Sequence, residues 1–327
     1  MLLFYSVWLP GFLLAGLISR RYRHQAWNIA LLRPELSVNA LLRFIGLGIT
    51  GSAGRKETTN TLVELLNRGI SPSLAFAFLI ASRNMTIHFW AIFALSLGAE
   101  FATGQLLGAL VMIGVVAVPL RSLNIGAVKI TTRQSPQADL TRELPEFSSW
   151  PGLLFSVSGW KFVLKFIGLE VRRFGLSLIA GIILGGIILA GGYQSWWPVF
   201  ADVFGHATLA SDLVNAVVGA VLSPVFFLSP VGNLPVIHAL FKTDGLGYPG
   251  IVSFCLASAI HPSDIQTYRN VFAPGRARAV VALLYLAAVL GGLGSTWIYD
   301  AFGFRPALPP VKLASKLARA VLEYLGF

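Results

Sequence analysis

The chain has 327 residues, of which 55% are hydrophobic and only 12% are charged, and its mean hydropathy is +0.73. A soluble domain carries roughly 25% charged residues, so this composition excludes an ordinary soluble protein and predicts that lipid is the solvent. The net charge of +11 would suit nucleic acid, but no aromatic-basic nucleic-acid motif is present and the Lys and Arg residues gather between apolar runs. The single cysteine, Cys255, excludes an internal disulfide and a thiolate metal cluster.

We therefore expect a multi-pass protein of the cell inner membrane, with membrane lipid as a partner. A transmembrane helix needs about 20 apolar residues. The uncharged or nearly uncharged runs are, in chain order, 2–19, 38–54, 84–99, 101–120, 174–192, 213–230 and 279–299. The first run carries no charge before Arg20 and no small-residue cleavage site follows it, so we interpret it as a retained helix rather than a signal peptide.

Two further segments repeat one pattern. Asn60 and Asn233 lie 173 residues apart, and each opens a pair of short apolar segments, which are 57–68 with 71–82 and 233–242 with 249–260. Each segment is too short to cross a bilayer, and Gly and Pro separate the members of each pair. We interpret each pair as a re-entrant helical hairpin, which is tolerated at depth only when it is buried in protein or lines a wet cavity.

The middle of the chain is polar and basic, which predicts a loop and then an amphipathic helix near 152–170 on the membrane surface. A second surface helix is expected near the C-terminus, where Lys312, Lys316 and Arg319 recur at helical spacing. The predicted organisation is a first membrane repeat (1–120), a cytoplasmic linker with an interfacial helix (121–173), a second membrane repeat (174–300) and a C-terminal amphipathic helix (301–327).

Basic residues indicate that the two repeats run in opposite directions. The loop after the first span holds four arginines between Arg20 and Arg33, whereas the equivalent loop 193–210 holds no Lys or Arg. By the positive-inside rule the first loop is cytoplasmic and the second is external. The predicted fold is an all-α polytopic membrane protein of two inverted-topology repeats, each with a re-entrant hairpin, as in many secondary transporters. The side of the C-terminal helix stays open.

Polar clusters open the first helix of each predicted hairpin. A helix N-terminus presents unpaired N–H groups and a partial positive charge, so two such ends facing each other could hold an anion near the bilayer middle. The alternative is that these residues only cap the helices, with Arg55 at the membrane interface. As residues lining a solute site we predict Arg55, Thr58, Thr59, Asn60, Ser229, Gly232 and Asn233.

The hairpin exits form a second predicted constellation. Arg83 lies between two apolar runs, so it should face protein or a cavity. His261 and Asp264 are three residues apart and could share a helix face and relay a proton, although a structural hydrogen bond is the alternative for each histidine. We add Ser82, Arg83 and Ser258 to the solute-binding set, and predict proton or ion coupling at His261, Asp264 and, more weakly, His238.

Motifs of the common enzyme classes are missing from the sequence. It contains no His-Glu-x-x-His, no Walker loop and no Gly-x-Ser-x-Gly elbow. We therefore expect no enzyme activity, no catalytic residue, no cofactor and no metal site. A membrane-embedded enzyme acting on lipids or their head groups remains an alternative through His261 with Asp264, and so does a non-transporting accessory subunit.

Two blocks carry a family resemblance. They are Leu65-Leu-Asn-Arg-Gly-Ile-Ser-Pro72 with 77–82, and Ser229-Pro-Val-Gly-Asn-Leu-Pro-Val-Ile-His-Ala-Leu240 with 253–258. These blocks resemble the predicted permeases of the ArsP/YraQ type, whose characterised members export organoarsenicals, and the resemblance covers most of 40–120 and 210–295. Family members commonly have a Cys-rich turn before the first hairpin, and many have Pro where this chain has Arg83. No soft thiolate ligand for arsenic is present at that turn.

The basic and hydroxyl-rich replacement of that turn fits an oxyanion or another polar anionic solute. The sequence thus predicts a permease that moves a small polar or anionic solute across the membrane by alternating access, driven by an ion or proton gradient. A homo-oligomer is compatible with this prediction.

Overall fold

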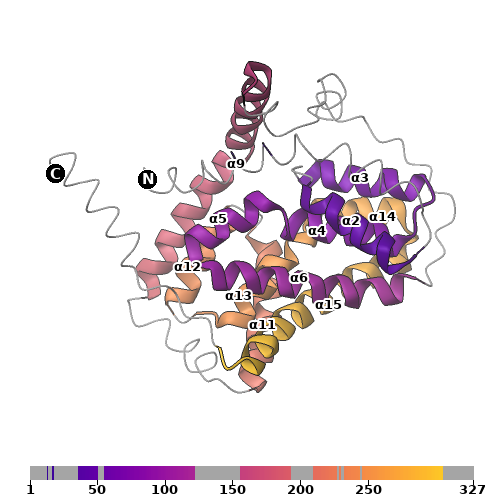
Figure 1. Cartoon of the computed structure of the whole chain (residues 1–327). Helices are drawn as coiled ribbons and strands as arrows, with labels where there is room; N and C mark the ends of the chain where they lie inside the picture. Colours follow the sequence, from indigo (N-terminus) through magenta and orange to yellow (C-terminus); the bar gives the residue numbers. More distant parts are fainter. Residues whose placement is uncertain are drawn as a thin grey trace.

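The computed structural model describes residues 36–50, 55–121, 155–192, 209–226, 228–229, 232–243 and 245–304, together with Leu13 and Leu17. All regular elements in these ranges are helical, as expected of the all-α class. They are α2 (Val38–Thr50), α3 (Arg55–Asn67), α4 (Pro72–Asn84), α5 (Ile87–Leu97), α6 (Ala99–Leu120), α9 (Val157–Gly192), α11 (Leu209–Val225), α12 (Asn233–Lys242), α13 (Tyr248–Leu256), the 3₁₀ turn η1 (Ala257–Ala259), α14 (Pro262–Val271) and α15 (Pro274–Ala301) (Figure 1). The predicted span 2–19, most of the linker, the loop after α9 and the predicted C-terminal helix lie outside the described residues.

Helices α6 and α15 pack against each other. They are the two described helices that are long and apolar enough to cross a bilayer. Their backbones approach closely, because a Cβ atom added to Gly108 would lie 2.9 Å from the carbonyl oxygen of Gly291, and one added to Gly291 would lie 2.7 Å from that of Gly108. Small residues at a crossing allow such close helix packing where lipid removes the hydrophobic driving force.

Helices α4 and α13 are buried on all sides. Every residue of both is buried, including the polar residues Ser73, Ser82, Arg83 and Asn84 of α4, and neither helix has a polar face toward the outside. Helix α4 packs against α2, α3 and α6, and α13 packs against α11, α15 and α6. With 13 and 9 residues they are roughly 20 and 14 Å long, well short of the roughly 30 Å hydrocarbon core.

The sequence Gly-Ile-Ser-Pro forms the turn between α3 and α4. Gly69 has φ +80°, the left-handed conformation that favours glycine, and its N–H donates to the carbonyl of Leu66 at 3.0 Å. The N–H of Ile70 donates to the carbonyl of Leu65 at 3.1 Å, which completes a Schellman motif. Pro72 then begins α4, where its missing N–H costs nothing. The two helices therefore form a tight helical pair.

Helix α9 differs from the expectation. We expected a surface helix over 152–170 and a separate span from residue 174, but one unbroken helix runs for 36 residues, about 54 Å. No proline lies between Val157 and Gly192, so nothing in the sequence ends the helix at the predicted domain boundary. Figure 1 shows its N-terminal half projecting away from the other labelled helices, while the C-terminal half packs on α12.

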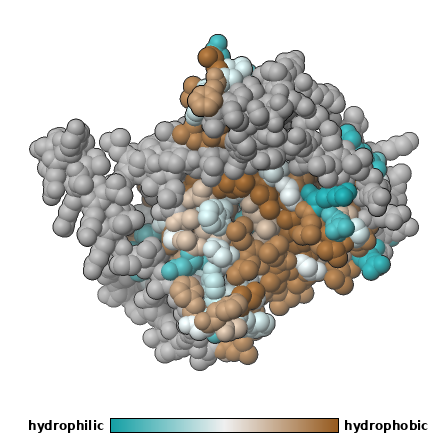
Figure 2. Space-filling view, in the orientation of Figure 1, coloured by the Kyte–Doolittle hydropathy of each residue, from teal (hydrophilic) through white to brown (hydrophobic). Residues whose placement is uncertain are grey.

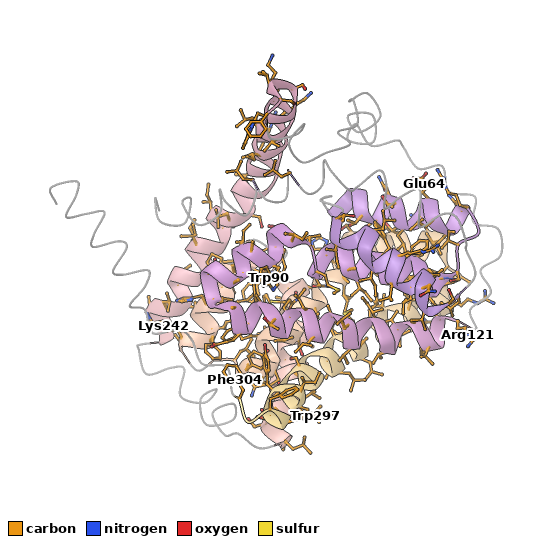
Figure 3. All side chains as sticks on the ribbon, viewed as in Figure 1. Glu64, Trp90, Arg121, Lys242, Trp297 and Phe304 are labelled. Carbon is orange, nitrogen blue, oxygen red and sulfur yellow. The ribbon has the colours of Figure 1, made fainter. Side chains whose placement is uncertain are left out.

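The outer surface is largely apolar. Figure 2 shows a broad hydrophobic area on the face toward the viewer, where α6 and α15 lie in Figure 1. Figure 3 places the charged residues Glu64 and Arg121 at one end of the helical bundle and Lys242 at the opposite end. Large apolar side chains that stay exposed on these helices include Leu110, Val118, Leu286 and Trp297. Lipid is the environment that such a surface fits.

Candidate functional site

The buried polar residues include an ion pair between Arg83 and Asp264. Arg83 lies in the last turn of α4 and Asp264 in the first turn of α14. The Nη1 atom of Arg83 donates to Oδ2 of Asp264 at 2.6 Å, and Nη2 donates to Oδ1 at 3.0 Å. Their side chains are only 4% and 2% exposed. This bidentate pair joins residues 181 positions apart in the chain.

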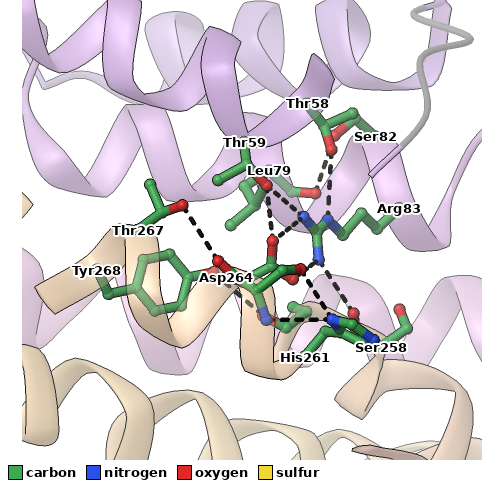
Figure 4. Close-up of polar contacts among 12 residues, drawn as sticks. Thr58, Thr59, Leu79, Ser82, Arg83, Ser258, His261, Asp264, Thr267 and Tyr268 are labelled. Atoms are coloured by element: carbon green, nitrogen blue, oxygen red, sulfur yellow. Dashed lines mark hydrogen bonds and ion pairs between the residues drawn. The ribbon is translucent and has the colours of Figure 1, made fainter. Parts of the chain in front are cut away.

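Hydroxyl and carbonyl groups complete the surroundings of the pair (Figure 4). The Oγ1 atom of Thr59 accepts from Arg83 Nη2 at 2.6 Å and donates to Asp264 Oδ1 at 2.8 Å. Arg83 Nη1 also donates to the carbonyl of Ser258 at 3.0 Å, and Nε makes a longer bond of 3.4 Å to Thr58 Oγ1. The guanidinium therefore contacts α3, η1 and α14 at once. We call these five residues the ion-pair cluster.

Helix ends favour the charges in this arrangement. Arg83 lies at the C-terminal end of α4 and contacts the carbonyl of Ser258 in η1, which follows α13, so its positive charge meets the negative ends of two helices. Asp264 lies in the first turn of α14, where a negative charge is favoured. Burial removes both charges from water, and removing one partner of such a pair leaves an uncompensated buried charge. Buried ionisable groups in membrane proteins generally mark solute or ion pathways.

A chain of amide and hydroxyl groups continues from the ion-pair cluster. Asn84 Oδ1 accepts from Ser258 Oγ at 3.3 Å and from Gln105 Nε2 at 3.1 Å, while Asn84 Nδ2 donates to the carbonyl of Ile80 at 3.2 Å. Gln105 is 1% exposed, and its Oε1 atom has no hydrogen-bond partner among the described residues. Polar contacts thus run through the core from α3 to α6.

A second cluster lies at the start of α12, and we call it the α12 cluster. The N–H of Ser229 donates to Ser177 Oγ of α9 at 2.7 Å, and the N–H of Gly232 donates to Ser229 Oγ at 3.1 Å. Only glycine fits at 232, because an added Cβ would overlap the hydroxyl and carbonyl oxygens of Ser177. Asn233 is 3% exposed and its Oδ1 has no partner within the described ranges.

Comparison with known proteins gives the family. A family model described as a predicted permease of the ArsP type matches residues 2–295. The chain belongs to this predicted permease family. It is also 24% identical over 259 residues to "Putative permease Rv2963" of Mycobacterium tuberculosis, an alignment that covers 76% of this chain and 63% of that relative. No solved structure matches the chain.

Membership of this family makes the chain a membrane protein and supports a transporter rather than an enzyme. The family match agrees with the apolar outer surface and with the two helices long enough to span a bilayer. In the described part of the permease, no group of three or more His, Cys, Asp or Glu residues is arranged to hold a metal ion.

The permease brings some of the predicted site residues together and separates others. Thr58, Thr59, Arg83, Ser258 and Asp264 meet in the ion-pair cluster (Figure 4). Ser229, Gly232 and Asn233 lie in the α12 cluster instead. Figure 1 shows α3 and α12 in different parts of the bundle, with α3 against α4 and α14 and α12 against α9. The residues expected to form one central site therefore fall into two clusters.

The remaining predicted residues lie beside these clusters. Ser82 is buried on α4, where its hydroxyl donates to the carbonyl of Leu79 at 2.9 Å. Asn60 is half-buried on α3, and His238 is half-buried on α12. The backbone of Arg55 begins α3, but its side chain lies outside the described part of the structure.

His261 caps α14. Its Nδ1 atom accepts from the N–H of Ser263 at 3.2 Å and lies 2.8 Å from the hydroxyl of the same residue. This is the structural hydrogen bond that we considered as the alternative to a proton relay. Asp264 instead directs its carboxylate to Arg83 and Thr59. The proton relay between His261 and Asp264 remains a prediction.

Sequence reasoning missed the partners that complete both clusters. Gln105 could have been found, because it is an amide within the apolar run 101–120, and such polar residues in spans are rare and functional. Ser177 could not, because serine is common in membrane helices and gives no distinct signal. Asn84 belongs to the run Ser82-Arg-Asn84 at the first hairpin exit, but it was not chosen as a site residue, because only its position next to Arg83 pointed to a role.

Proposed function

We propose that this permease is a secondary transporter that moves a small polar or anionic solute across the cell inner membrane by alternating access. The observation that carries the proposal is the buried bidentate pair of Arg83 with Asp264. The planar guanidinium matches the two oxygens of a carboxylate or a similar oxyanion, and it remains charged at any physiological pH. Asp264 occupies this position in the structure as an internal anion.

The transport cycle exchanges one anion for another on Arg83. When the anionic group of the solute replaces the carboxylate of Asp264, that carboxylate loses its cation in a buried place. An unpaired buried carboxylate is costly, so it takes up a proton from water on the open side. The solute and the proton are then bound together and leave together when Asp264 returns to Arg83. This exchange makes the permease a proton symporter.

The same exchange connects binding to movement. The ion pair links α4 in the first half of the chain with α14 in the second half, so breaking it removes a strong contact between the two halves. A rocking motion of one half against the other needs such a contact to form and break. Packing supports two related units around the pair, because α2 on α4 and α4 on α6 correspond to α11 on α13 and α13 on α15. Inverted-topology repeats with re-entrant hairpins are the arrangement that we propose.

The alternatives have less support. An enzyme acting on lipid head groups would need His261 as a base with Asp264 as its orienting partner, whereas the carboxylate of Asp264 pairs with Arg83 and accepts from Thr59. An accessory subunit would not need a buried ion pair surrounded by hydroxyl groups.

The test is transport into proteoliposomes that contain the full chain and the pH dye pyranine. Gradients of inorganic phosphate, methylphosphonate, ethanesulfonate, isethionate and lactate are imposed in turn. At least one anion should acidify the lumen several times faster than in protein-free liposomes. Arg83→Ala should abolish this flux. Asp264→Asn, which cannot take up a proton, should lose acidification but keep exchange of the radiolabelled anion across the membrane.

The matched control is Glu64→Gln, which removes an ion pair with Arg68 at 2.5 Å on the exposed face of α3. This control should transport like the unmodified protein. If every anion in the panel moves equally fast in the unmodified protein and in Arg83→Ala, the proposal fails.

A further inference from the structure

The polar groups next to the ion-pair cluster leave one strong acceptor unused. Gln105 is 1% exposed and its Oε1 atom has no partner among the described residues. Folded proteins pair nearly all their buried polar atoms, because a buried acceptor without a donor loses its hydrogen bonds to water and gains none in return. An acceptor left open beside a binding site therefore points to a donor on the ligand.

The direction of this acceptor is fixed by its neighbours. Asn84 gives its Nδ2 to the carbonyl of Ile80, so its Oδ1 is the atom that faces Ser258 and Gln105. Since Oδ1 can only accept, Gln105 must present its Nε2 group to Asn84. The Oε1 atom of Gln105 is consequently held as an acceptor, and it cannot exchange places with the nitrogen without breaking that bond.

One residue links this acceptor to the guanidinium. The carbonyl of Ser258 accepts from Arg83, and the hydroxyl of Ser258 donates to Asn84, which holds Gln105. The open acceptor and the anion-binding cation thus belong to one hydrogen-bonded network made by α4, η1 and α6. A small solute that reaches Arg83 enters the same polar region.

We propose that this permease selects anions that carry a hydrogen-bond donor beside their anionic group, with the anion on Arg83 and an O–H or N–H group on Oε1 of Gln105. Hydroxy-substituted and amino-substituted small acids are the class of solute that fits. The inference rests on the proposed function, because it assigns a second contact to the same solute. A site that hydrogen-bonds a hydroxyl group rejects an analogue that lacks it much more strongly than an apolar pocket does.

Two matched pairs of anions test this selectivity. Isethionate differs from ethanesulfonate by one hydroxyl group, as lactate differs from propionate. Binding of each anion to the detergent-purified full chain is followed through the intrinsic fluorescence of its 8 tryptophans and through the thermal unfolding midpoint. The hydroxylated member of at least one pair should bind at least about tenfold more tightly. Gln105→Met should reduce the preference for the hydroxylated member of that pair to less than about twofold.

The outcomes separate the inference from the proposed function. If both members of each pair bind equally and Arg83→Ala abolishes their binding, the selectivity inference is overturned and the anion site stands. If no anion binds in a manner that depends on Arg83, both are overturned. The preference within the unmodified protein decides the question even if Gln105→Met does not fold. A preference that persists in a folded Gln105→Met variant would assign the donor contact to another residue and overturn the inference.

Discussion

The ion-pair cluster and the α12 cluster solve the problem of buried polarity in different ways. The ion-pair cluster holds a full positive and a full negative charge, and each is matched by side chains and carbonyls from α3, α4, η1 and α14. The α12 cluster uses backbone N–H groups, the hydroxyls of Ser177 and Ser229, and a glycine, Gly232, that lets two backbones approach closely. The comparison teaches that burial alone does not identify a solute site.

The difference lies in what each cluster can exchange. A carboxylate paired with a guanidinium can be replaced by another oxyanion and can then take up a proton. In both states the guanidinium is paired with an anion and no unpaired charge is buried. The contacts given for the α12 cluster are hydrogen bonds of backbone N–H groups to serine hydroxyls and the close approach of Gly232 to Ser177, and a change there would separate α12 from α9. We therefore propose that the ion-pair cluster binds the solute and that the α12 cluster holds helices together.

The largest expected effect follows from breaking the ion pair on one side. Arg83→Met or Asp264→Leu alone should lower the free energy of unfolding by about 3–5 kcal/mol, because each leaves a buried charge without its partner. The double variant should recover most of this loss, since no charge then remains. Thermal unfolding in detergent, analysed as a double-mutant cycle, measures the coupling. Losses that simply add would contradict this account of the cluster.

A control for that experiment is already present in the chain. Glu64→Gln breaks the ion pair with Arg68, whose side chains are 44% and 46% exposed, so its cost should stay within about 1 kcal/mol. The contrast between the buried pair and the exposed pair shows whether burial gives Arg83 and Asp264 their importance.

A smaller effect is expected at the α12 cluster. Gly232→Ala should lower the free energy of unfolding by about 1–3 kcal/mol, because its Cβ would overlap Ser177 and force α12 away from α9. Adding Ser177→Ala should not rescue the variant, since the carbonyl oxygen of residue 177 would still be in the way. Unfolding in detergent followed by tryptophan fluorescence measures both variants.

Gly186→Ala provides the matched control on α9. An added Cβ there meets nothing within 4 Å, so alanine should be neutral or stabilise the helix by about 0.5–1 kcal/mol. If Gly232→Ala and Gly186→Ala behave alike, the close contact between α9 and α12 is not what holds this region together.

The elements that could be predicted from the sequence are those whose ends are marked by nearby glycine or proline residues. The segment 233–242 coincides with α12, and the Gly-Ile-Ser-Pro run marks the turn before α4, because glycine and proline act within a few residues. Arg83 and Asp264 were each recognised as candidates, but their pairing depends on a contact across 181 residues that no local pattern contains. The unbroken course of α9 was missed because charged residues were taken to mark the end of a membrane helix, and charge alone does not end a helix.

The variant with the smallest expected effect on stability gives the clearest test of whether the two clusters differ in function. Asn233→Leu replaces a buried amide whose Oδ1 has no partner among the described residues, so it should change the free energy of unfolding by less than about 1 kcal/mol. If the α12 cluster only joins helices, anion flux into proteoliposomes should also continue, whereas Arg83→Ala abolishes it. A folded Asn233→Leu variant without flux would instead assign solute binding to the start of α12, as the capped helix ends in the sequence first suggested. Because the amide oxygen of Asn233 is as open as that of Gln105, this variant tests whether connection to a charge, rather than an open acceptor alone, defines the site.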